Sequence, residues 1–351
     1  MKIGMMSAWN TDSGVAIHAE AVGKAWRKMG HELTVFTFMK EDFHGEGFTG
    51  DDEDYVIRCI GTRKTNYLDP RPILAADFDI FVVQDLNMLP VESLAKIFPL
   101  IRKKAKTVHI VHENALPEEA WFYQFDWDGV VYFCHRQNSL GSVYPEAKRI
   151  HFPCFSLRKK DKMEARKKLG LPLDKKIIYE FCQRGYKPFL RNLPEELKKK
   201  AVLLVVIPLS CEFLEEDSPP SWMIIHREEA LSHEKFDDYL FASDAVIFHK
   251  FQSRYHAVVS STTFQALGTG CPILVPGQSD FFFPFKNEVV RYADIEDLRK
   301  TLVELMENGE RYKALREKAE QFVKKNSAGR IAEEHIKLFN SLLKNSRERT
   351  F

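Results

Sequence analysis

Two cationic side chains follow a short apolar run in the second half of the chain. The run at residues 177–182 predicts a strand, and the letters QRGYKP that come next place Arg184 and Lys187 just beyond its end. Two cations at a strand tip can stabilise a negatively charged group without a metal ion. The alternative interpretation is an ordinary turn with two charges that face solvent.

Three hydroxyl side chains open a predicted helix further along. Ser261, Thr262 and Thr263 stand at its start, and the helix ends at Leu267. Hydroxyl groups and the free backbone N–H groups of a helix start both suit a phosphate. The same residues could instead only cap the helix, although capping and phosphate binding are compatible.

A histidine and a glutamate end an apolar run in the first half. His112 closes the predicted strand at residues 107–112, and Glu113 follows it. An imidazole at a strand tip can position a substrate or respond to charge on it, whereas a lone histidine near a core is more often only packed. We expect packing for His109 and a functional role for His112, with Glu113 orienting the ring or binding a substrate.

The chain opens with a unit that suits an anion. An apolar run at residues 3–6 leads into a polar loop at residues 10–13, and Gly14 then opens an amphipathic helix that ends at Gly30. A second apolar run, at residues 33–38, completes a strand–helix–strand unit. Free N–H groups and the helix dipole favour an anion at such a turn. The G-x-G-x-x-G fingerprint is absent, which disfavours a dinucleotide-dependent oxidoreductase.

Strands and helices alternate along both halves, which predicts two doubly wound α/β domains. Further strands are expected at residues 55–60, 80–84, 107–112, 129–134, 149–152, 177–182, 202–207, 223–226, 245–248 and 273–275. We expect an N-terminal domain over residues 1–155, a C-terminal domain over residues 156–326, and a last helix within residues 327–351 that packs back on the N-terminal domain. Residues 157–162 are expected as a hinge, and the strand tips of both domains are expected to face a cleft.

Composition excludes several classes of protein. With 51 Lys and Arg against 50 Asp and Glu, the formal net charge is +1, so no general attraction to nucleic acid is expected. No apolar run approaches the roughly 20 residues of a membrane span, and the first strand begins too early for a signal peptide. The six cysteines have no C-x-x-C spacing, so we expect buried free thiols in the cytoplasm and no metal site.

Two features leave a membrane contact open. Basic clusters occur at residues 102–106, 158–162, 166–168 and 198–200. They are typical of solvated helix faces, with a surface for anionic lipid headgroups at the inner membrane face as the second interpretation. The aromatic run at residues 281–285 is expected in the core, with an exposed lip for a lipid-linked acceptor as its alternative.

Several segments, in order, resemble the GT-B glycosyltransferases, specifically the large retaining group known as family 4. SGVAIHAEAVGKAWRKMGHELTVFT resembles the first strand–helix–strand unit of that family, FDIFVVQD its third strand, and VHIVHEN its T-x-H-D strand tip. ARKKLGLPLDKKIIYEFCQRGYKP resembles the linker helix, strand and G-R-x-x-x-x-K turn of its donor domain. The later block that contains STTFQALGTGCPILVP resembles its E-A-x-A-x-G-x-P region. The resemblance spans nearly the whole chain and implies a GT-B fold, with two Rossmann-like doubly wound domains and an interdomain cleft.

This resemblance implies a role for each residue singled out above. His112, Arg184 and Lys187 are implied as catalytic, with His112 beside the transferred sugar and the two cations on the leaving diphosphate. The donor nucleotide is expected to contact Gly14, Arg184, Lys187, Arg227, Ser261, Thr262, Thr263 and Gln265, and the acceptor is expected to contact Asp12, Ser13, His18 and Glu113. His18 is alternatively an exposed or capping histidine, and Arg227, near the expected nucleobase, is alternatively a surface residue.

The departures from the family pattern lie where its chemistry is. The family has two glutamates separated by seven residues; the second falls on Gln265 and the first on Ala257. Gln265 can still bind a ribose through its amide, whereas Ala257 implies an altered sugar pocket, another branch or lost catalysis. Lys187 comes two residues earlier than the lysine of the family turn.

The resemblance implies a glycosyltransferase of the hexosyltransferase type. It would move a sugar from a nucleotide diphosphate sugar to a glycan, lipid-linked or small-molecule acceptor, with retention, without a metal and without a further cofactor. Two alternatives stay open. One is a GT-B-like binding or scaffold protein that has lost catalysis, and the other is a GT-B enzyme such as a sugar-nucleotide epimerase.

Overall fold

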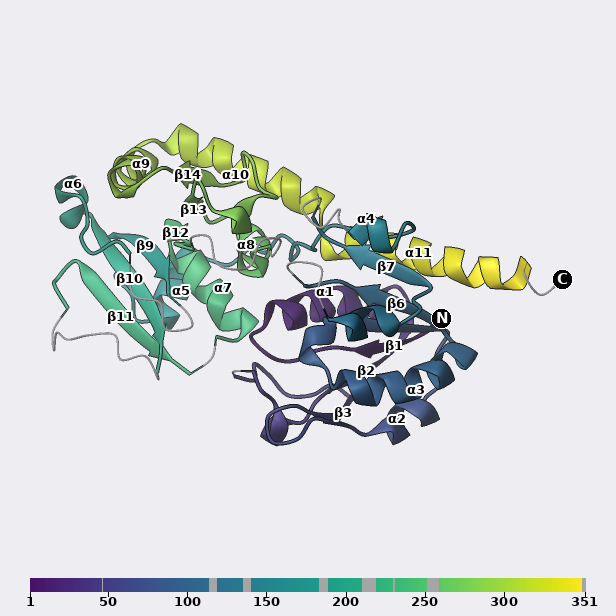
Figure 1. Ribbon diagram of the computed structural model, residues 1–351. Coiled ribbons are helices and arrows are strands. Elements are labelled where there is room, and N and C mark those ends of the chain that lie inside the picture. The colour runs from purple at the N-terminus through teal and green to yellow at the C-terminus, as the bar shows by residue number, and fades with distance from the viewer. Residues whose placement is uncertain are drawn as a thin grey trace. The chain divides into compact units, whose positions relative to one another are not determined.

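A computed structural model describes residues 1–45, 47–113, 119–134, 140–182, 189–209, 219–229, 231–250 and 259–348. The chain forms two compact units, each built around its own sheet (Figure 1). The first unit comprises Met1–Pro153, Arg254–Ser261 and Asn326–Phe351, and the second comprises Cys154–Ser253 and Thr262–Lys325. Arg184, Lys187 and Ala257 lie outside the described residues.

The sheet of the first unit is parallel apart from one edge strand. Its strand order is β4-β3-β2-β1-β5-β6-β7-β8, with only β3 and β4 antiparallel among the described pairs. The strands are β1 (Lys2–Met6), β2 (Glu32–Phe38), β3 (Val56–Gly61), β4 (Tyr67–Leu68), β5 (Ile80–Gln84), β6 (Lys106–Ile110), β7 (Gly129–Tyr132) and β8 (Lys148–Arg149). The helices are α1 (Gly14–Lys28), α2 (Pro70–Ala75), α3 (Val91–Lys104), α4 (Leu140–Val143) and α11 (Ala328–Glu348), with short 3₁₀ turns η1 (Lys40–Asp42), η2 (Leu86–Met88) and η3 (Ala120–Gln124).

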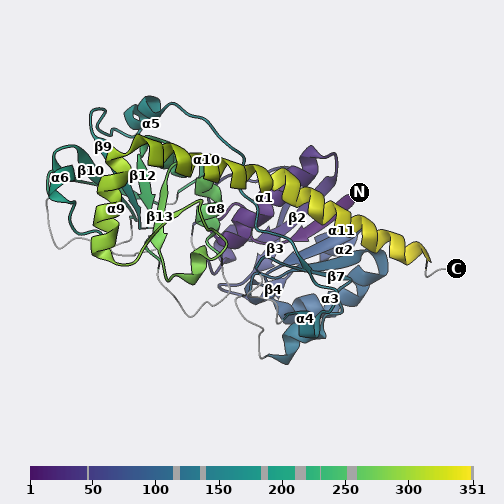
Figure 2. The same ribbon diagram turned by 90° about the horizontal axis from the view of Figure 1, so that it is seen from above.

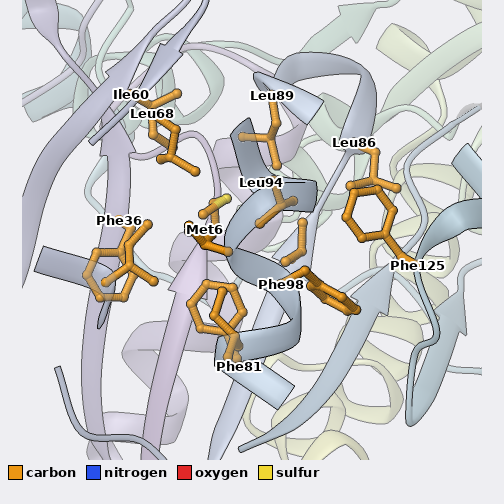
Figure 3. Packing of buried hydrophobic residues seen from close by; sticks show 14 of the residues in the cluster. Met6, Phe36, Ile60, Leu68, Phe81, Leu86, Leu89, Leu94, Phe98 and Phe125 are labelled. Carbon is orange, nitrogen blue, oxygen red and sulfur yellow. The ribbon is translucent and has the colours of Figure 1, made fainter. Parts of the chain in front are cut away.

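Apolar side chains cover both faces of this sheet. Figure 3 shows Met6, Phe36 and Phe81 of neighbouring strands packed with Leu94 and Phe98 of α3. Because side chains alternate along a strand, the residues that precede and follow Met6, Phe36 and Phe81 in their strands point to the opposite face of the sheet. All four residues of the run IFVV in β5 are fully buried, which confirms the expected parallel strand covered on both faces.

The opposite face carries α1 and α11, which lie side by side in both ribbon views (Figures 1 and 2). Trp26 of α1 meets His335 and Phe339 of α11, with ring centroids 5.7 and 5.4 Å apart. All three side chains have no exposed surface. The last helix of the chain is therefore part of the hydrophobic core of the first unit.

The sheet of the second unit is parallel throughout its described pairs, in the order β11-β10-β9-β12-β13-β14. Its strands are β9 (Lys176–Phe181), β10 (Ala201–Pro208), β11 (Met223–Glu228), β12 (Ala245–Ile247), β13 (Ile273–Pro276) and β14 (Val290–Tyr292). Its helices are α5 (Lys162–Lys168), α6 (Glu195–Lys198), α7 (His233–Ala242), α8 (Ser261–Leu267), α9 (Ile295–Glu307) and α10 (Gly309–Lys325), with a 3₁₀ turn η5 (Asp280–Phe282). Two doubly wound α/β units are thus confirmed.

Ion pairs fix the polar segment that was expected as a hinge. Arg158 pairs with Asp237 at 2.6 Å, and Lys160 pairs with Asp238 at 2.6 Å, both on α7. The backbone of the same segment is bonded to the residue after α8, because the N–H of Arg158 donates to the carbonyl oxygen of Gly268 at 2.9 Å. Residues 157–162 are therefore held to their own unit by specific contacts.

Other basic clusters also have partners within the chain. Lys104 donates from Nζ to the carbonyl oxygens of Ile73, Leu74 and Ala76, at the C-terminal end of α2, over 2.6–3.1 Å. Cations favour that end of a helix because its last carbonyl groups lack intrahelical donors. Arg102 pairs with Asp126 at 2.5 Å. Local pairing thus accounts for these charges without an external ligand.

Three further expectations, on the aromatic run, the cysteines and membrane spans, can be compared with the structure. Phe281, Phe282 and Phe285 are buried, which confirms a core position for these three, whereas Phe283 is 46% exposed. Five cysteines, at positions 59, 134, 154, 182 and 271, are buried and form no disulfide, and Cys211 lies outside the described residues. Among the described helices, none combines the length and apolar character needed to cross a bilayer.

The packing at Gly4 gives a first prediction. A Cβ at this position of β1 would lie 2.9 Å from Cδ2 of Phe81 and 3.0 Å from Cδ1 of Phe78, both in the core. Gly4→Ala should therefore lower the free energy of unfolding by about 1–3 kcal/mol, as overpacked cores do. Chemical denaturation followed by tryptophan fluorescence measures the change.

Gly329→Ala is the matched control, because a Cβ at Gly329 meets no atom within 4 Å. This variant should be neutral or more stable by up to about 1 kcal/mol, since alanine favours helix more than glycine does. Equal effects of the two substitutions would contradict the packing argument.

Candidate functional site

Polar residues gather where β5 and β6 end. Gln84 is the last residue of β5 and Asp85 follows it, while His112 and Glu113 come just after β6. Parallel pairing sets Gln84 opposite Ile110, so the carboxyl ends of the two strands lie at one edge of the sheet. In open α/β sheets, ligands bind at this edge. The four residues therefore form a candidate site, which we call the β5–β6 tip.

The amide oxygen of Gln84 lies between two imidazoles. Oε1 is 2.8 Å from Nδ1 of His18, which comes from α1, and 2.9 Å from Nε2 of His112. The two rings meet edge to face with centroids 5.2 Å apart, and Phe133 lies 4.8 Å from the His112 ring. Gln84 is 1% exposed, so these contacts are closed off from water.

Burial keeps these imidazoles neutral. Desolvation, with the neighbouring His109 as a smaller cause, lowers the pKa of His112 to about 3. Desolvation also lowers the pKa of His18 well below its ordinary value, and the charges that His112 and His335 would carry lower it further. At neutral pH the rings therefore act through hydrogen bonds and lone pairs, and not as cations.

The two carboxyl groups of the β5–β6 tip lie close to each other. Asp85 has a left-handed backbone (φ 55°, ψ 88°), and its side chain accepts a hydrogen bond from the backbone N–H of Asn87 at 3.2 Å. Glu113 is 4% exposed and accepts from the N–H of Leu86 at 2.9 Å. Burial raises the pKa of both groups, and the charge of Asp85 further raises that of Glu113. The pair holds a proton more tightly than exposed carboxyls would.

His109 occupies the core, as its position predicted. Its side chain has no exposed surface and stacks on Trp127 with centroids 5.1 Å apart. Burial lowers the pKa of His109 to about 3. The ring is therefore neutral, and its approach to Glu113 at 3.7 Å is not an ion pair at neutral pH.

The opening loop is ordered by its own contacts. Ser13 caps α1, because its Oγ accepts from the N–H of Ala16 at 3.1 Å. Asn10 has φ 51°, and its Nδ2 donates to the carbonyl oxygen of Asp51 at 2.8 Å. Asp12, Ser13 and Gly14 are half-buried, so part of each still faces solvent.

His18 was expected either to contact an acceptor or to be an exposed or capping histidine, and the structure shows neither. It is neither exposed nor a cap, because it lies on the inner face of α1 with no exposed surface. A side chain without exposed surface cannot contact an acceptor, so burial corrects the direct contact expected from the sequence. His18 contacts the same Gln84 oxygen as His112 does, and through Gln84 it helps to hold the His112 ring in place.

Of the three hydroxyl-bearing residues at the start of α8, only two have exposed surface. Ser261 and Thr262 are half-buried, whereas Thr263 has no exposed surface and Gln265 is 3% exposed. Nε2 of Gln265 lies 3.2 Å from Nδ1 of His233. Burial therefore argues against the phosphate contact expected for Thr263, and the Gln265 amide already has a partner.

Arg227, a further predicted donor residue, lies in the second unit. Arg227 is exposed within β11, next to His226, whose Nδ1 lies 3.0 Å from the hydroxyl of Tyr239. Among the described residues, no cluster of three or more His, Cys, Asp or Glu side chains is arranged to hold a metal ion.

Sequence reasoning missed Gln84 and Asp85. The signal was present, because the letters QD directly follow the wholly apolar run IFVV. Polar residues that end a buried parallel strand lie at the edge where ligands bind. The pairing of β5 with β6 then places them beside His112 and Glu113.

The carboxyl pair predicts a pH dependence of stability. The pKa of Glu113, raised to about 8, lies above the ordinary glutamate value, so the folded state holds its proton more tightly than the unfolded chain. The contribution of this group is favourable at low pH and is lost as pH rises from about 4.5 to about 8. Glu113→Gln keeps an acceptor oxygen for the Leu86 N–H without titrating.

The free energy of unfolding of Glu113→Gln, relative to wild type, should therefore rise across that pH window. Urea denaturation at several pH values measures it, with the exposed Glu333→Gln as control. A difference between Glu113→Gln and wild type that stays constant with pH would contradict the assignment.

The fold of the chain is shared by known enzymes of low sequence identity. No family model matches the sequence. Sucrose-phosphate synthase from Thermosynechococcus elongatus is 13% identical, with a TM-score of 0.61 over 98% of this chain and 100% of that one. Trehalose-6-phosphate synthase is 10% identical, with a TM-score of 0.64 over 97% and 99% of the two chains.

The catalytic domain of starch synthase IV from Arabidopsis thaliana, bound to ADP and acarbose, is 10% identical, with a TM-score of 0.62 over 98% and 99%. These structures are GT-B glycosyltransferases. At such identities the likeness shows the fold, and the chain therefore has the GT-B fold with two Rossmann-like units.

Proposed function

We propose that this protein is a glycosyltransferase that moves a sugar from a nucleotide diphosphate sugar to a hydroxyl of a glycan, lipid-linked or small-molecule acceptor. The observation that carries the proposal is the β5–β6 tip, a neutral, half-buried His112 held by Gln84 beside two carboxyls. The GT-B fold supports it, because solved structures with this fold include starch synthase bound to ADP and an α-glucosyltransferase bound to UDP.

A neutral imidazole suits the transition state of this reaction. Sugar transfer passes through an oxocarbenium-like state, in which positive charge develops on the sugar ring. An imidazolium would repel that charge, whereas His112 with a pKa of about 3 is uncharged at neutral pH. His112 would therefore position the sugar and tolerate its charge.

The acceptor would lie on the first unit. Asp85 is half-buried at the β5–β6 tip, and Asp12 and Ser13 present partly exposed polar atoms on the opening loop. Carboxylates and hydroxyls of this kind hydrogen-bond sugar hydroxyls. Glu113, which fixes the turn after Asp85, would hold this surface in shape.

The leaving diphosphate would contact the residues that follow β9 and the start of α8. Arg184 and Lys187 would neutralise its charge, and Ser261 with Thr262 would supply hydroxyls at the start of α8. Cations in this role make a metal ion unnecessary, which is the basis for proposing metal independence. Retention of configuration follows from the resemblance to family 4 and belongs to the same proposal.

A second candidate is a GT-B-like protein that binds nucleotides without transferring sugar. The observation in its favour is Gln265, which replaces a family glutamate and is hydrogen-bonded to His233. Incubation with a nucleotide sugar separates the candidates. Transfer or slow hydrolysis supports the enzyme, unreacted bound donor supports the second candidate, and an isomerised donor supports an epimerase.

The proposed donor site predicts the effect of Arg184→Ala. Calorimetry with UDP, ADP and GDP should identify one nucleotide that binds wild type, and saturating amounts should raise its melting temperature by mass action. Arg184→Ala should weaken that binding about tenfold or more, because a charge-assisted contact is lost. Its melting temperature without nucleotide should stay unchanged.

Arg299→Ala serves as the control, because Arg299 lies on α9 and pairs only with the exposed Glu296 among the described residues. It should bind nucleotide as wild type does. Equal affinity of Arg184→Ala and wild type would refute the proposed role of Arg184.

The role of His112 predicts a split between binding and turnover. His112→Ala should lower kcat by on the order of 100-fold, as loss of one group that acts on the transition state does. Nucleotide affinity should be unaffected, because the diphosphate is proposed to bind elsewhere. Initial rates and calorimetry on the same preparation measure both quantities, and an unchanged kcat would overturn the assignment.

A further inference from the structure

The surroundings of Gln84 fix the orientation of its side-chain amide. Its Nε2 lies 3.4 Å from Sδ of Met5. A thioether sulfur can only accept a hydrogen bond, so the NH₂ group belongs on that side. The amide oxygen then faces the two imidazoles, at 2.8 Å from His18 and 2.9 Å from His112.

This orientation decides which nitrogen of each ring carries a proton. An amide oxygen can only accept, so Nδ1 of His18 and Nε2 of His112 must both be N–H donors. The two bonds together use both lone pairs of the oxygen. A neutral imidazole has a single N–H, and therefore Nδ1 of His112 and Nε2 of His18 carry lone pairs.

The lone pair of His112 is the one that a ligand can reach. Among the described residues, the only hydrogen bond of the His112 ring is the one from Nε2 to Gln84. The residue is half-buried, whereas His18 has no exposed surface and its Nε2 has no partner within the described part of the chain. Nδ1 of His112 is thus a hydrogen-bond acceptor at the tip of the sheet.

We propose that Gln84 is a positioning residue that holds His112 in its Nε2–H tautomer, so that Nδ1 accepts a hydrogen bond from a hydroxyl of the transferred sugar. The second half of this statement rests on the proposed function. The first half concerns the protein alone and can be tested without a substrate.

The packing around the pair prevents the rings from exchanging roles. His18 is enclosed by Phe133, Phe152 and His335, with centroid distances of 4.9, 5.3 and 5.9 Å. His18 therefore cannot turn away and leave Gln84 free to rotate. Among the described residues, the titratable groups next to this network are His335 from α11, His109 and Glu113 from β6 and its end, and Asp85, which follows Gln84.

The site would consequently discriminate between sugars. A lone pair fixed at Nδ1 would accept a hydrogen bond from a sugar hydroxyl at the facing position. A deoxy sugar or a ring oxygen at that position would leave this lone pair without a donor. One neutral hydrogen bond of this kind corresponds to about a three- to tenfold preference in kcat/KM. Gln84 would control this preference without touching the substrate.

The tautomer is measured directly by nitrogen NMR of protein labelled with ¹⁵N-histidine. His112→Asn and His18→Asn spectra assign the two rings. Wild type should show His112 protonated at Nε2 and bare at Nδ1, at neutral pH and without ligand. A His112 ring protonated at Nδ1, or doubly protonated, would overturn the proposal.

Two substitutions at Gln84 then separate positioning from folding. Gln84→Met removes the acceptor at similar volume, so His112 should populate both tautomers and kcat/KM for the donor should fall about three- to tenfold. Gln84→Glu places a carboxylate against the ring and should raise the pKa of His112. Activity of Gln84→Glu should then decline at lower pH, where His112 is protonated, and recover as pH rises.

Thr37→Val is the matched control, since Thr37 is buried in β2 of the same sheet with no partner for its hydroxyl in the described residues. It should change neither the tautomer nor the pH profile. A Gln84→Met protein with wild-type tautomer and kcat/KM would refute the proposal. If no nucleotide binds wild type, the proposed function fails, whereas the tautomer result still decides the role of Gln84.

Discussion

The constraint on which this molecule depends is that a parallel sheet covered on both faces offers polar chemistry only at its ends. In β5 the residues 80–83 are fully buried, and a polar side chain among them would need a partner inside the core. Gln84 is the first position where the strand can carry one. Its amide is satisfied within the protein by two imidazoles, so the network that ends the strand is also the network that shapes the site.

The same burial explains why the β5–β6 tip carries so little charge. His112 and the neighbouring His18 are neutral because desolvation lowers their pKa, and Glu113 holds a proton because burial raises its pKa to about 8. In the proposed function, such a site would recognise hydroxyls by the direction of a hydrogen bond and not by charge. The cations proposed for a diphosphate, Arg184 and Lys187, instead follow β9 in the sequence.

The sequence predicted the fold well because apolar runs of parallel strands are long and wholly hydrophobic. It predicted that His112 and Glu113 stand at the end of a strand, because they end such a run. It did not predict the burial of His18. Hydrophobic periodicity shows which face of a helix is apolar, but it does not show that a polar residue can be buried when a strand supplies a hydrogen-bond partner. Gln84 supplies that partner from 66 residues away, and only the pairing of β1 with β5 brings it there.

The glutamine at position 265 has a physical consequence that bears on the proposed chemistry. The amide lies against His233, and Arg158 donates to the Gln265 carbonyl oxygen at 2.9 Å, so this turn of α8 carries no carboxylate. A glutamate there would repel a diphosphate bound nearby, and strong cations would be needed to offset it. With a neutral amide that repulsion would be absent, so the proposed contact of Arg184 and Lys187 with a diphosphate would have less negative charge to offset. Of the three departures from the family pattern, at positions 187, 257 and 265, the neutral amide at 265 is therefore compatible with the proposed diphosphate contact.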